Sequence, residues 1–382
     1  MESISTPKEA VNWDSSESVA MSIVYSSNKG GSSKSTISVL HAIAAAAANP
    51  ERTVIFWDCS LYGDATTQLL GGFEPVPFVT DEGQSVQRAR GIANAHAASC
   101  TGSMLIRAAG AHALLLEAQG SWVPNSQWRL ISTLSGQRRV AAFDPMPFIL
   151  NVVESGGDKS LPPNLFLVPG GPSLEDPGLP WEAASKTFQD ALKGMTLDGS
   201  HLIIFDTDHD LGAPNARFAL SLGESIHVPI KTDAADLERL FADNHGLFPV
   251  LRDMRERGFP TGVVSRLIFT QLKSSKYEQV ELELGGQHAT PSAFDVSATD
   301  LADVRARLDR LRQYVLTEAP ATLADGTLDT DGVVLVPLLP PSVLKPIKNN
   351  GVNYQTPPKQ SDGATWRKVG AALDFAMARL GV

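Results

Sequence analysis

Cysteine is scarce in this chain of 382 residues, which contains only Cys59 and Cys100. Two cysteines cannot form the disulfide framework of a small secreted domain, and neither has partners at the spacing of a zinc site. Long apolar runs are also missing, because the longest alanine-rich run, 42–48, is far too short to span a bilayer. The N-terminal segment carries Glu2 and Glu9 and lacks the apolar core of a signal peptide. These absences predict a soluble, cytoplasmic protein without a membrane anchor.

Positive charge is in deficit, with 32 Lys and Arg against 42 Asp and Glu and a net charge of −10. Such a balance argues against broad electrostatic attraction to DNA or anionic lipid. The segment from Ser342 onward is a local exception, and its candidate DNA contacts are Lys345, Lys348, Arg367 and Lys368. An ordinary solvated helix surface is the alternative interpretation of these residues. The apolar content of 43% is typical of a globular protein that can bury a large core.

Glycine, serine and lysine concentrate in residues 28–36, between the apolar run 22–25 and the alanine-rich stretch 37–48. This arrangement predicts a strand, a tight turn and a helix N-terminus, which together bind an anion through backbone N–H groups and the helix dipole. Lys34 would neutralise the β- and γ-phosphates, and the Ser35 hydroxyl would ligate Mg²⁺. The residues expected to contact the nucleotide here are Lys29, Gly30, Gly31, Ser32, Ser33, Lys34, Ser35 and Thr36.

This loop departs from the usual G-x-x-x-x-G-K-[ST] pattern, since Asn28 and Ser33 stand where its two glycines belong. The sequence fits K-G-G-x-x-K-[ST] instead, with an additional lysine, Lys29, at the start of the loop. If the position of Ser33 requires a positive φ, serine costs about 1 kcal/mol or more relative to glycine there.

Two acidic residues end apolar strand patterns, Asp58 after 53–57 and Asp206 after 201–205. In a parallel sheet such residues emerge at the carboxyl ends of the strands, where open α/β folds bind ligands. Asp206 is the Walker B candidate, acting through a metal-bound water. The predicted metal site therefore combines Ser35, Asp58 and Asp206. A helix cap or a surface position is the alternative for an acid at a strand end.

Taken together, these segments resemble the ParA/MinD family of dimeric P-loop ATPases. Residues 58–67 are similar to the ParA motif D-x-D-P-Q-G-N-A-T, residues 205–212 to D-T-P-P-x-x-G, and residues 339–343 to the I-P-x-S segment. The resemblance covers roughly residues 20 to 75 and 160 to 382. It implies that Lys29 reaches the nucleotide of a partner subunit. It also places Thr270, Gln271, Pro340 and Pro341 at the nucleotide and makes Lys29, Lys34, Asp58 and Ser60 the catalytic set.

The main departure from the family is Ser60, which replaces the second Asp of D-x-D. A neutral hydroxyl can orient a water molecule, but it lacks the charge that favours proton removal. Asp208 and Asp210 fall where the family has proline and a neutral residue, so either could compensate; the alternative is that both are solvated loop acids. We therefore expect slow or partner-stimulated ATP hydrolysis.

The remaining sequence predicts an α/β fold with a mostly parallel twisted sheet and helices on both faces, a P-loop NTPase of the deviant Walker A type. We expect a flexible segment 1–19 and a single ParA-like domain 20–382, with 76–160 as a helical, family-variable insertion. Expected strands are 22–27, 53–58, 164–168, 201–206, 225–230, 263–270 and 333–338. Expected helices are 34–48, 181–193, 214–222, 233–257, 299–317 and 362–380, with further helical stretches near 86–98 and 104–118.

No Asn/Thr-Lys-x-Asp segment for guanine occurs, so ATP with Mg²⁺ is the expected cofactor. The resemblance implies an ATP-dependent homodimer that acts as a switch in DNA partition or cargo positioning. A ParB-like or adaptor activator and nonspecific nucleoid DNA are the expected partners. Alternatives are a MinD-like membrane-cycling ATPase, a metabolic synthetase and a nonhydrolysing ATP-sensing scaffold. About twenty residues precede the loop, too few for a helix-turn-helix domain.

Overall fold

The computed structural model describes residues 21–27, 33–80, 83–97, 101–120, 143–171, 174, 178–195, 201–242, 245–284, 289–318, 323, 332–356 and 363–381. The expected flexible segment 1–19 lies outside these residues. Within them, no helix combines the length and apolar character needed to cross a bilayer.

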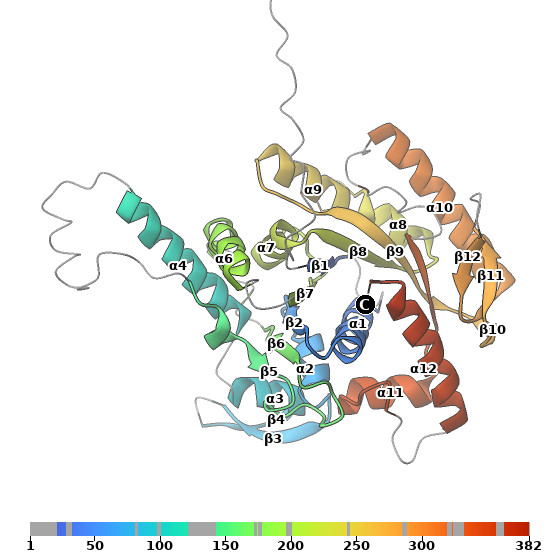
Figure 1. The fold of residues 1–382 in the computed structure, drawn as a ribbon, viewed down its shortest axis with the longest axis horizontal. Helices are drawn as coiled ribbons and strands as arrows, with labels where there is room; N and C mark the ends of the chain where they lie inside the picture. Colours follow the sequence, from blue (N-terminus) through green and yellow to red (C-terminus); the bar gives the residue numbers. More distant parts are fainter. Residues whose placement is uncertain are drawn as a thin grey trace, which may run out of the picture.

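An eight-stranded sheet forms the centre of the molecule (Figure 1). Its spatial order is β14 (Val333–Pro337), β9 (Val263–Leu272), β8 (Ser225–Ile230), β1 (Met21–Tyr25), β7 (His201–Asp206), β2 (Thr53–Asp58), β6 (Leu165–Val168) and β5 (Leu150–Asn151). Every neighbouring pair is parallel except β5 with β6. The mostly parallel α/β sheet expected from the sequence is thus confirmed.

The central strands are buried on both faces, which explains why their sequences are almost continuously apolar. In β2, Ile55 and Trp57 face one core cluster while Val54 and Phe56 face the other. This alternation follows from the two-residue period of a strand. The sheet therefore separates two hydrophobic layers.

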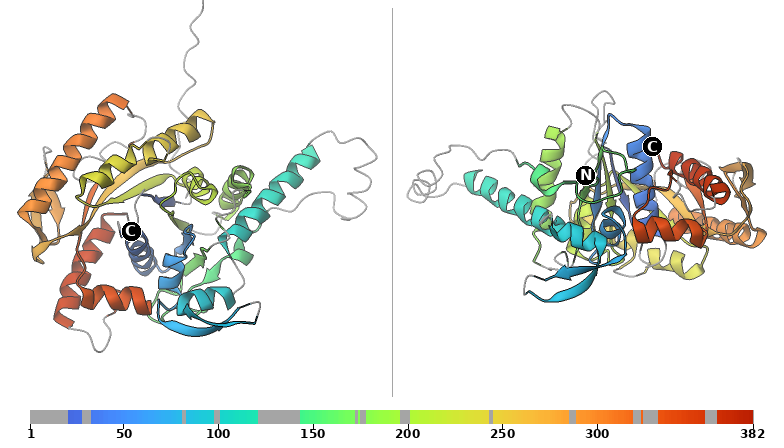
Figure 2. Two further views of the ribbon diagram at one scale, coloured as in Figure 1. Left: turned by 180° about the vertical axis from the view of Figure 1, so that it is seen from behind. Right: turned by 90° about the horizontal axis from the view of Figure 1, so that it is seen from below.

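Helices cover both faces of the sheet (Figure 1). One side carries α4 (Gly102–Gly120), α6 (Trp181–Met195), α7 (Pro214–Leu222), α8 (Ala234–Leu240), α9 (Leu247–Glu256) and α10 (Ala298–Glu318). The other carries α1 (Lys34–Ala48), α2 (Asp64–Leu69), α3 (Arg90–Ala97), α11 (Pro341–Asn350) and α12 (Gly363–Ala378). On α10, Val304, Leu308 and Leu311 are buried and lie on one face of the helix. Both views in Figure 2 show α4 projecting from the body of the molecule.

The single helix expected over 233–257 is wrong, because the structure has α8 and α9 with a break between them. Gly246 precedes α9, and a Cβ there would lie 2.6 Å from the Leu240 carbonyl oxygen. Pro249 then occupies the first turn of α9, where its missing N–H is tolerated. In a continuous helix the same proline would break a hydrogen bond, so the chain restarts instead.

The described part of segment 76–160 is less helical than expected. It contains the antiparallel hairpin β3 (Pro75–Val79) and β4 (Ser85–Ala89), the short 3₁₀ helix η1 (Met146–Phe148) and strand β5, besides α3 and α4. The helix expected near 86–98 begins only at Arg90. Two small antiparallel pairs were not expected from the sequence. They are β10 (Ser274–Lys276) with β13 (Asp295–Val296) and β11 (Val280–Glu283) with β12 (Ala289–Ser292).

Candidate functional site: the carboxyl edge of the central strands

Strands β1, β7 and β2 end side by side at one edge of the sheet. Their registers pair Tyr25 with Asp206, and Asp206 in turn with Asp58. The two acids that the sequence places at strand ends are therefore neighbours, and both are fully buried. Like charges in a buried position disfavour ionisation, so this edge needs positive charge nearby.

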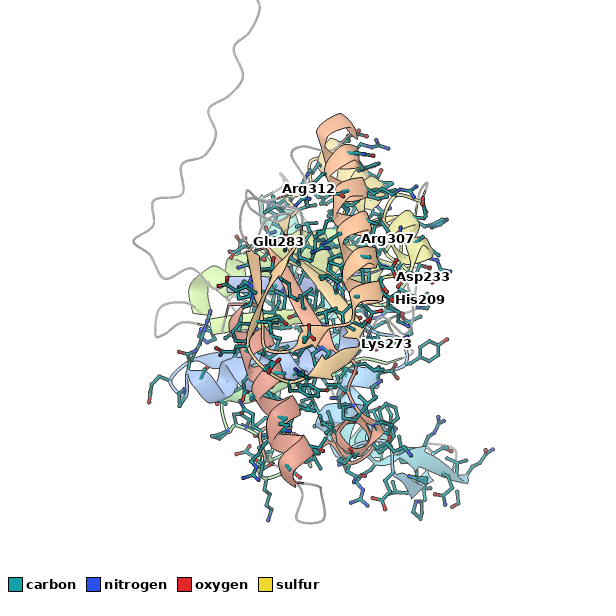
Figure 3. All side chains as sticks on the ribbon, turned by 90° about the vertical axis from the view of Figure 1, so that its right-hand side faces the viewer. His209, Asp233, Lys273, Glu283, Arg307 and Arg312 are labelled. Atoms are coloured by element: carbon teal, nitrogen blue, oxygen red, sulfur yellow. The ribbon has the colours of Figure 1, made fainter. Side chains whose placement is uncertain are left out.

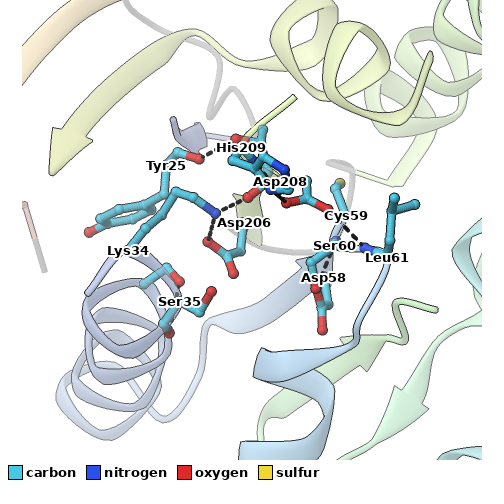
Figure 4. Close-up of polar contacts among 12 residues, drawn as sticks. Tyr25, Lys34, Ser35, Asp58, Cys59, Ser60, Leu61, Asp206, Asp208 and His209 are labelled. Carbon is cyan, nitrogen blue, oxygen red and sulfur yellow. Dashed lines mark hydrogen bonds and ion pairs between the residues drawn. The ribbon is translucent and has the colours of Figure 1, made fainter. Parts of the chain in front are cut away.

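Lys34, the first residue of α1, supplies that charge (Figure 4). Its Nζ donates to Asp206 Oδ1 at 3.2 Å and also to the carbonyl oxygen of Thr207. The lysine side chain is buried with the carboxylate. The loop lysine and the Walker B candidate thus meet. Lys29, Gly30, Gly31 and Ser32 lie outside the described residues, and their contacts stay predictions.

Asp206 has the properties of a metal-site carboxylate. Burial raises its pKa, while Lys34 and the nearby Ser35 hydroxyl oppose that shift. Its Oδ2 is buried and has no hydrogen-bond partner in the described part of the chain. A hydroxyl beside an unpartnered carboxylate oxygen suits Mg²⁺, which takes few protein ligands and completes its shell with water and phosphate oxygens. In the same ranges no group of three or more His, Cys, Asp or Glu residues could hold a metal by itself.

Both carboxylate oxygens of Asp58 accept hydrogen bonds from residues that follow β2. Its Oδ1 accepts from the Ser60 backbone N at 2.9 Å and from Ser60 Oγ at 2.7 Å. Its Oδ2 accepts from the Thr66 backbone N at 2.7 Å and from Thr66 Oγ1 at 2.8 Å. Burial and the neighbouring Asp206 raise the pKa of Asp58 to about 6, although these hydrogen bonds act in the opposite direction. A role as metal ligand would require Asp58 to give up some of these bonds.

Ser60 is likewise engaged, because its Oγ donates to Asp58 and accepts from the Gly63 N–H at 3.1 Å. The hydroxyl therefore shapes the turn that leads into α2. Thr66 and Gly170 also support this loop, which was not expected from the sequence: the Gly170 N–H donates to Thr66 Oγ1 at 2.9 Å. A Cβ at Gly170 would lie 2.7 Å from Asp58 Cγ. The glycine pair that follows β6 was the available sequence signal.

Helix α1 is fixed to the sheet beneath the site by a buried polar contact. The Tyr25 hydroxyl lies 2.7 Å from Nδ1 of His41 on α1. Burial lowers the pKa of His41 to about 3, so the ring is neutral at physiological pH. This contact joins β1 to α1.

Ser33 and Gln271 share an unusual backbone conformation and contact each other. Their φ angles are 64° and 62°, and within the described ranges no other residue except glycine has a positive φ. The positive φ considered for Ser33 from the sequence is thus present. Gln271 Nε2 donates to Ser33 Oγ at 2.9 Å. As a result the Ser33 hydroxyl does not cap its own helix, and the N–H groups at the start of α1 stay available to an anion.

The other expected nucleotide contacts occupy defined places. Thr36 is buried in α1, and Thr270 is buried with its hydroxyl 3.4 Å from the Ile230 carbonyl oxygen. Pro340 and Pro341 start α11 just after β14, whose end pairs with Leu272 of β9. They therefore lie at the same end of the sheet as Gln271.

The candidate DNA contacts lie on two consecutive helices, α11 and α12. Lys345 and Lys348 are on α11, whereas Arg367 and Lys368 are on α12. Lys345, Arg367 and Lys368 are exposed, and Lys348 is half-buried. Figure 1 shows both helices on the face of the sheet that carries α1.

We expect the Ser33–Gln271 contact to contribute about 1 kcal/mol to stability, the usual net value of a single hydrogen bond. The double-mutant cycle formed by Ser33→Ala, Gln271→Ala and both together should show that coupling in urea unfolding. Purely additive effects would show that the two side chains do not stabilise each other.

The comparisons with known proteins bear on the fold. No protein-family model and no curated protein matches the sequence. Among solved structures, pNOB8 ParA superposes with a TM-score of 0.52 at 12% identity, covering 94% of this chain and 98% of that one. Cyanothece McdA in complex with ATP gives 0.51 at 12% identity, covering 96% and 98%, and apo McdA from the same organism gives 0.50 at 12%, covering 95% and 100%. The chain therefore shares the mostly parallel α/β fold of these ParA and McdA structures.

Proposed function

We propose that the protein is a ParA-like ATPase that uses ATP·Mg²⁺ to switch between monomer and dimer in DNA partition or intracellular cargo positioning. One observation supports this most directly. The buried pair of Lys34 and Asp206 lies at the N-terminus of α1, beside the Ser35 hydroxyl. A lysine, a hydroxyl, a carboxylate and a helix N-terminus are the parts that bind a triphosphate with its metal.

The proposed switch works through the γ-phosphate. Two subunits face each other across two ATP·Mg²⁺ units, and Lys29 of each completes the site of the other. The dimer forms only with ATP because the γ-phosphate, which both subunits contact, stabilises the dimer relative to the monomer. Hydrolysis, slow because of Ser60 and accelerated by a ParB-like or adaptor activator, returns the protein to monomers. The ATP dimer binds nonspecific DNA in the cytoplasm through local basic residues.

A nonhydrolysing ATP-sensing scaffold is the second candidate. The hydrogen bonds of Ser60 to Asp58 and Gly63 favour it, since they leave this side chain committed to the turn. ATP-dependent dimers without phosphate release, even with an activator present, would favour the scaffold over the ATPase.

Sizing the protein by light scattering without nucleotide, with ADP and with ATP, each with and without duplex DNA, tests the proposal. We expect dimers with ATP alone and salt-sensitive DNA binding by those dimers. Lack of any ATP binding would refute the proposal. GTP that displaces ATP with equal affinity would refute the assignment of ATP.

Lys29→Ala tests the contact between subunits. We expect this variant to lose ATP-dependent dimerisation while its monomer keeps most of its ATP affinity, because the lysine would act on the nucleotide of the partner. Lys34→Ala is the comparison, since it removes a contact within the same subunit. Equal loss of ATP affinity in both variants would contradict the trans role of Lys29.

A further inference from the structure

The acids at the carboxyl ends of the central strands differ in the hydrogen bonds and ion pairs that their side chains already form. Asp58 already accepts four hydrogen bonds from Ser60 and Thr66. Asp206 is paired with Lys34. Asp210 accepts from the Gly212 N–H at 2.9 Å and lies in the exposed part of its loop. Asp208 therefore stands apart as a buried acid that joins two loops of the site.

Asp208 bridges the loops that follow β7 and β2. Its Oδ2 accepts from the Leu61 backbone N at 3.3 Å, which places a carboxylate next to Ser60. Its Oδ1 accepts from the His209 backbone N at 2.6 Å and contacts Nδ1 of the His209 ring. Burial alone raises the pKa of Asp208, but the hydrogen bonds from His209 and Leu61 and the His209 ring outweigh it, so the net shift is downward. The group is an anion at neutral pH.

This pair lies next to the lysine that would hold the phosphates. Lys34 donates to the carbonyl oxygen of Thr207, the residue before Asp208 (Figure 4). The His209 side chain is 56% exposed, so water reaches it. Its Nε2 has no hydrogen bond among the described residues. In Figure 3, His209 lies on the same side of the molecule as Asp233 and Lys273, which follow the ends of β8 and β9.

The contact between Asp208 and His209 fixes which nitrogen of the ring donates a hydrogen bond and which one accepts. When Asp208 Oδ1 accepts from Nδ1–H, the neutral ring must present Nε2 as an acceptor. A carboxylate that fixes the tautomer and orientation of an imidazole in this way is a recurrent arrangement for taking a proton from a nucleophile.

We propose that His209, positioned by Asp208, is the catalytic residue that orients and deprotonates the water attacking ATP. This inference rests on the proposed function and assigns to a neighbouring loop the task that Ser60 cannot perform. The water oxygen bonds to the γ-phosphorus, and the bond from that phosphorus to the bridging oxygen of ADP breaks. The proton of the water passes to Nε2 of His209 and then to solvent, which leaves ADP and inorganic phosphate.

The experiment measures single-turnover ATP hydrolysis together with the affinity for ATP·Mg²⁺. His209→Ala should hydrolyse ATP about 100-fold more slowly, the usual contribution of a positioned general base, with ATP affinity within about twofold of wild type. Asp208→Asn should lose about tenfold or more, because the ring is no longer held in the acceptor tautomer. Asp210→Asn, in the same loop, is the matched control and should keep the wild-type rate.

Chemical rescue separates a catalytic role from a structural one. Because the ring is half-exposed, free imidazole should restore part of the rate of His209→Ala and none of the rate of Lys34→Ala. His209→Gln preserves bulk and polarity and covers the case in which the alanine variant fails to fold; it should also be slow and should bind ATP normally.

Three results with the variants would overturn the inference. The first is a wild-type rate of hydrolysis in His209→Ala, and the second is a loss of rate in Asp210→Asn equal to that in His209→Ala. The third is a slow His209→Ala variant that also binds ATP weakly and is not rescued by imidazole. Wild-type protein that binds ATP but never hydrolyses it also overturns the inference and leaves ATP binding intact. Wild-type protein that does not bind ATP refutes the proposed function itself.

Discussion

Lys34→Ala is expected to weaken ATP binding by about 100-fold or more, since it removes charge-assisted hydrogen bonds to phosphate in a buried position. Isothermal titration with ATP·Mg²⁺ measures this loss. Lys186→Ala is the matched control, because Lys186 is an exposed lysine on α6. Wild-type affinity in Lys34→Ala would mean that the turn before α1 does not bind the triphosphate.

The same substitution should destabilise the protein even without nucleotide. Lys34 neutralises Asp206, which is fully buried. A buried carboxylate that loses its cation costs about 3 kcal/mol. Lys34→Ala combined with Asp206→Asn should recover part of this stability in urea unfolding while ATP binding stays lost. That divergence would separate the electrostatic role of Lys34 in folding from its role in binding.

Asp58→Ala is expected to lower the free energy of unfolding by about 3 to 5 kcal/mol. The substitution strands the backbone N–H groups of Ser60 and Thr66 in a buried loop. Asp58→Asn should cost less, since its amide oxygen still accepts from one side of the loop. Asp64→Ala, an exposed acid at the start of α2, is the control and should change stability little. Equal effects of Asp58→Ala and Asp64→Ala would contradict the structural role of Asp58.

The contribution of Asp58 to the free energy of unfolding changes with pH in a definite direction. Because the pKa of Asp58 is raised to about 6 in the folded protein, the folded state binds this proton more tightly than the unfolded chain does. The contribution of Asp58 to stability is therefore greatest below about pH 4 and declines as the pH rises to about 6. Unfolding measured across this window should show a smaller decline in Asp58→Asn than in wild type, because Asp206, whose pKa burial also raises, is still present in the variant.

Several elements followed from the sequence because their causes are local. Strands 53–58, 201–206 and 225–230 and helices 34–48 and 214–222 have the expected bounds. Apolar runs long enough for a strand buried on both faces, flanked by glycine, proline or an acid, leave few alternatives. Asp58 and Asp206 could be placed together because acids at the ends of parallel strands meet at one edge of the sheet.

The division of α8 from α9 shows where local pattern failed. Leu237, Leu240, Leu247 and Leu251 are all buried and suggest one continuous amphipathic helix. The two helices pack with Gly246 close to the Leu240 carbonyl oxygen. This approach requires a turn between them, which the spacing of the apolar residues does not predict.

By itself the sequence determined the main parallel strands, several of the helices between them and the two acids at strand ends. Only the tertiary structure decided which hydrogen bonds the polar side chains of the site form with one another. The Gln271–Ser33 bond joins residues 238 positions apart, and the Asp208–Leu61 bond joins residues 147 positions apart. Such contacts depend on the order of strands in the sheet, with β1 between β7 and β8. Propensity and periodicity describe neighbours along the chain, whereas hydrogen bonds between loops depend on which strand ends the fold brings together.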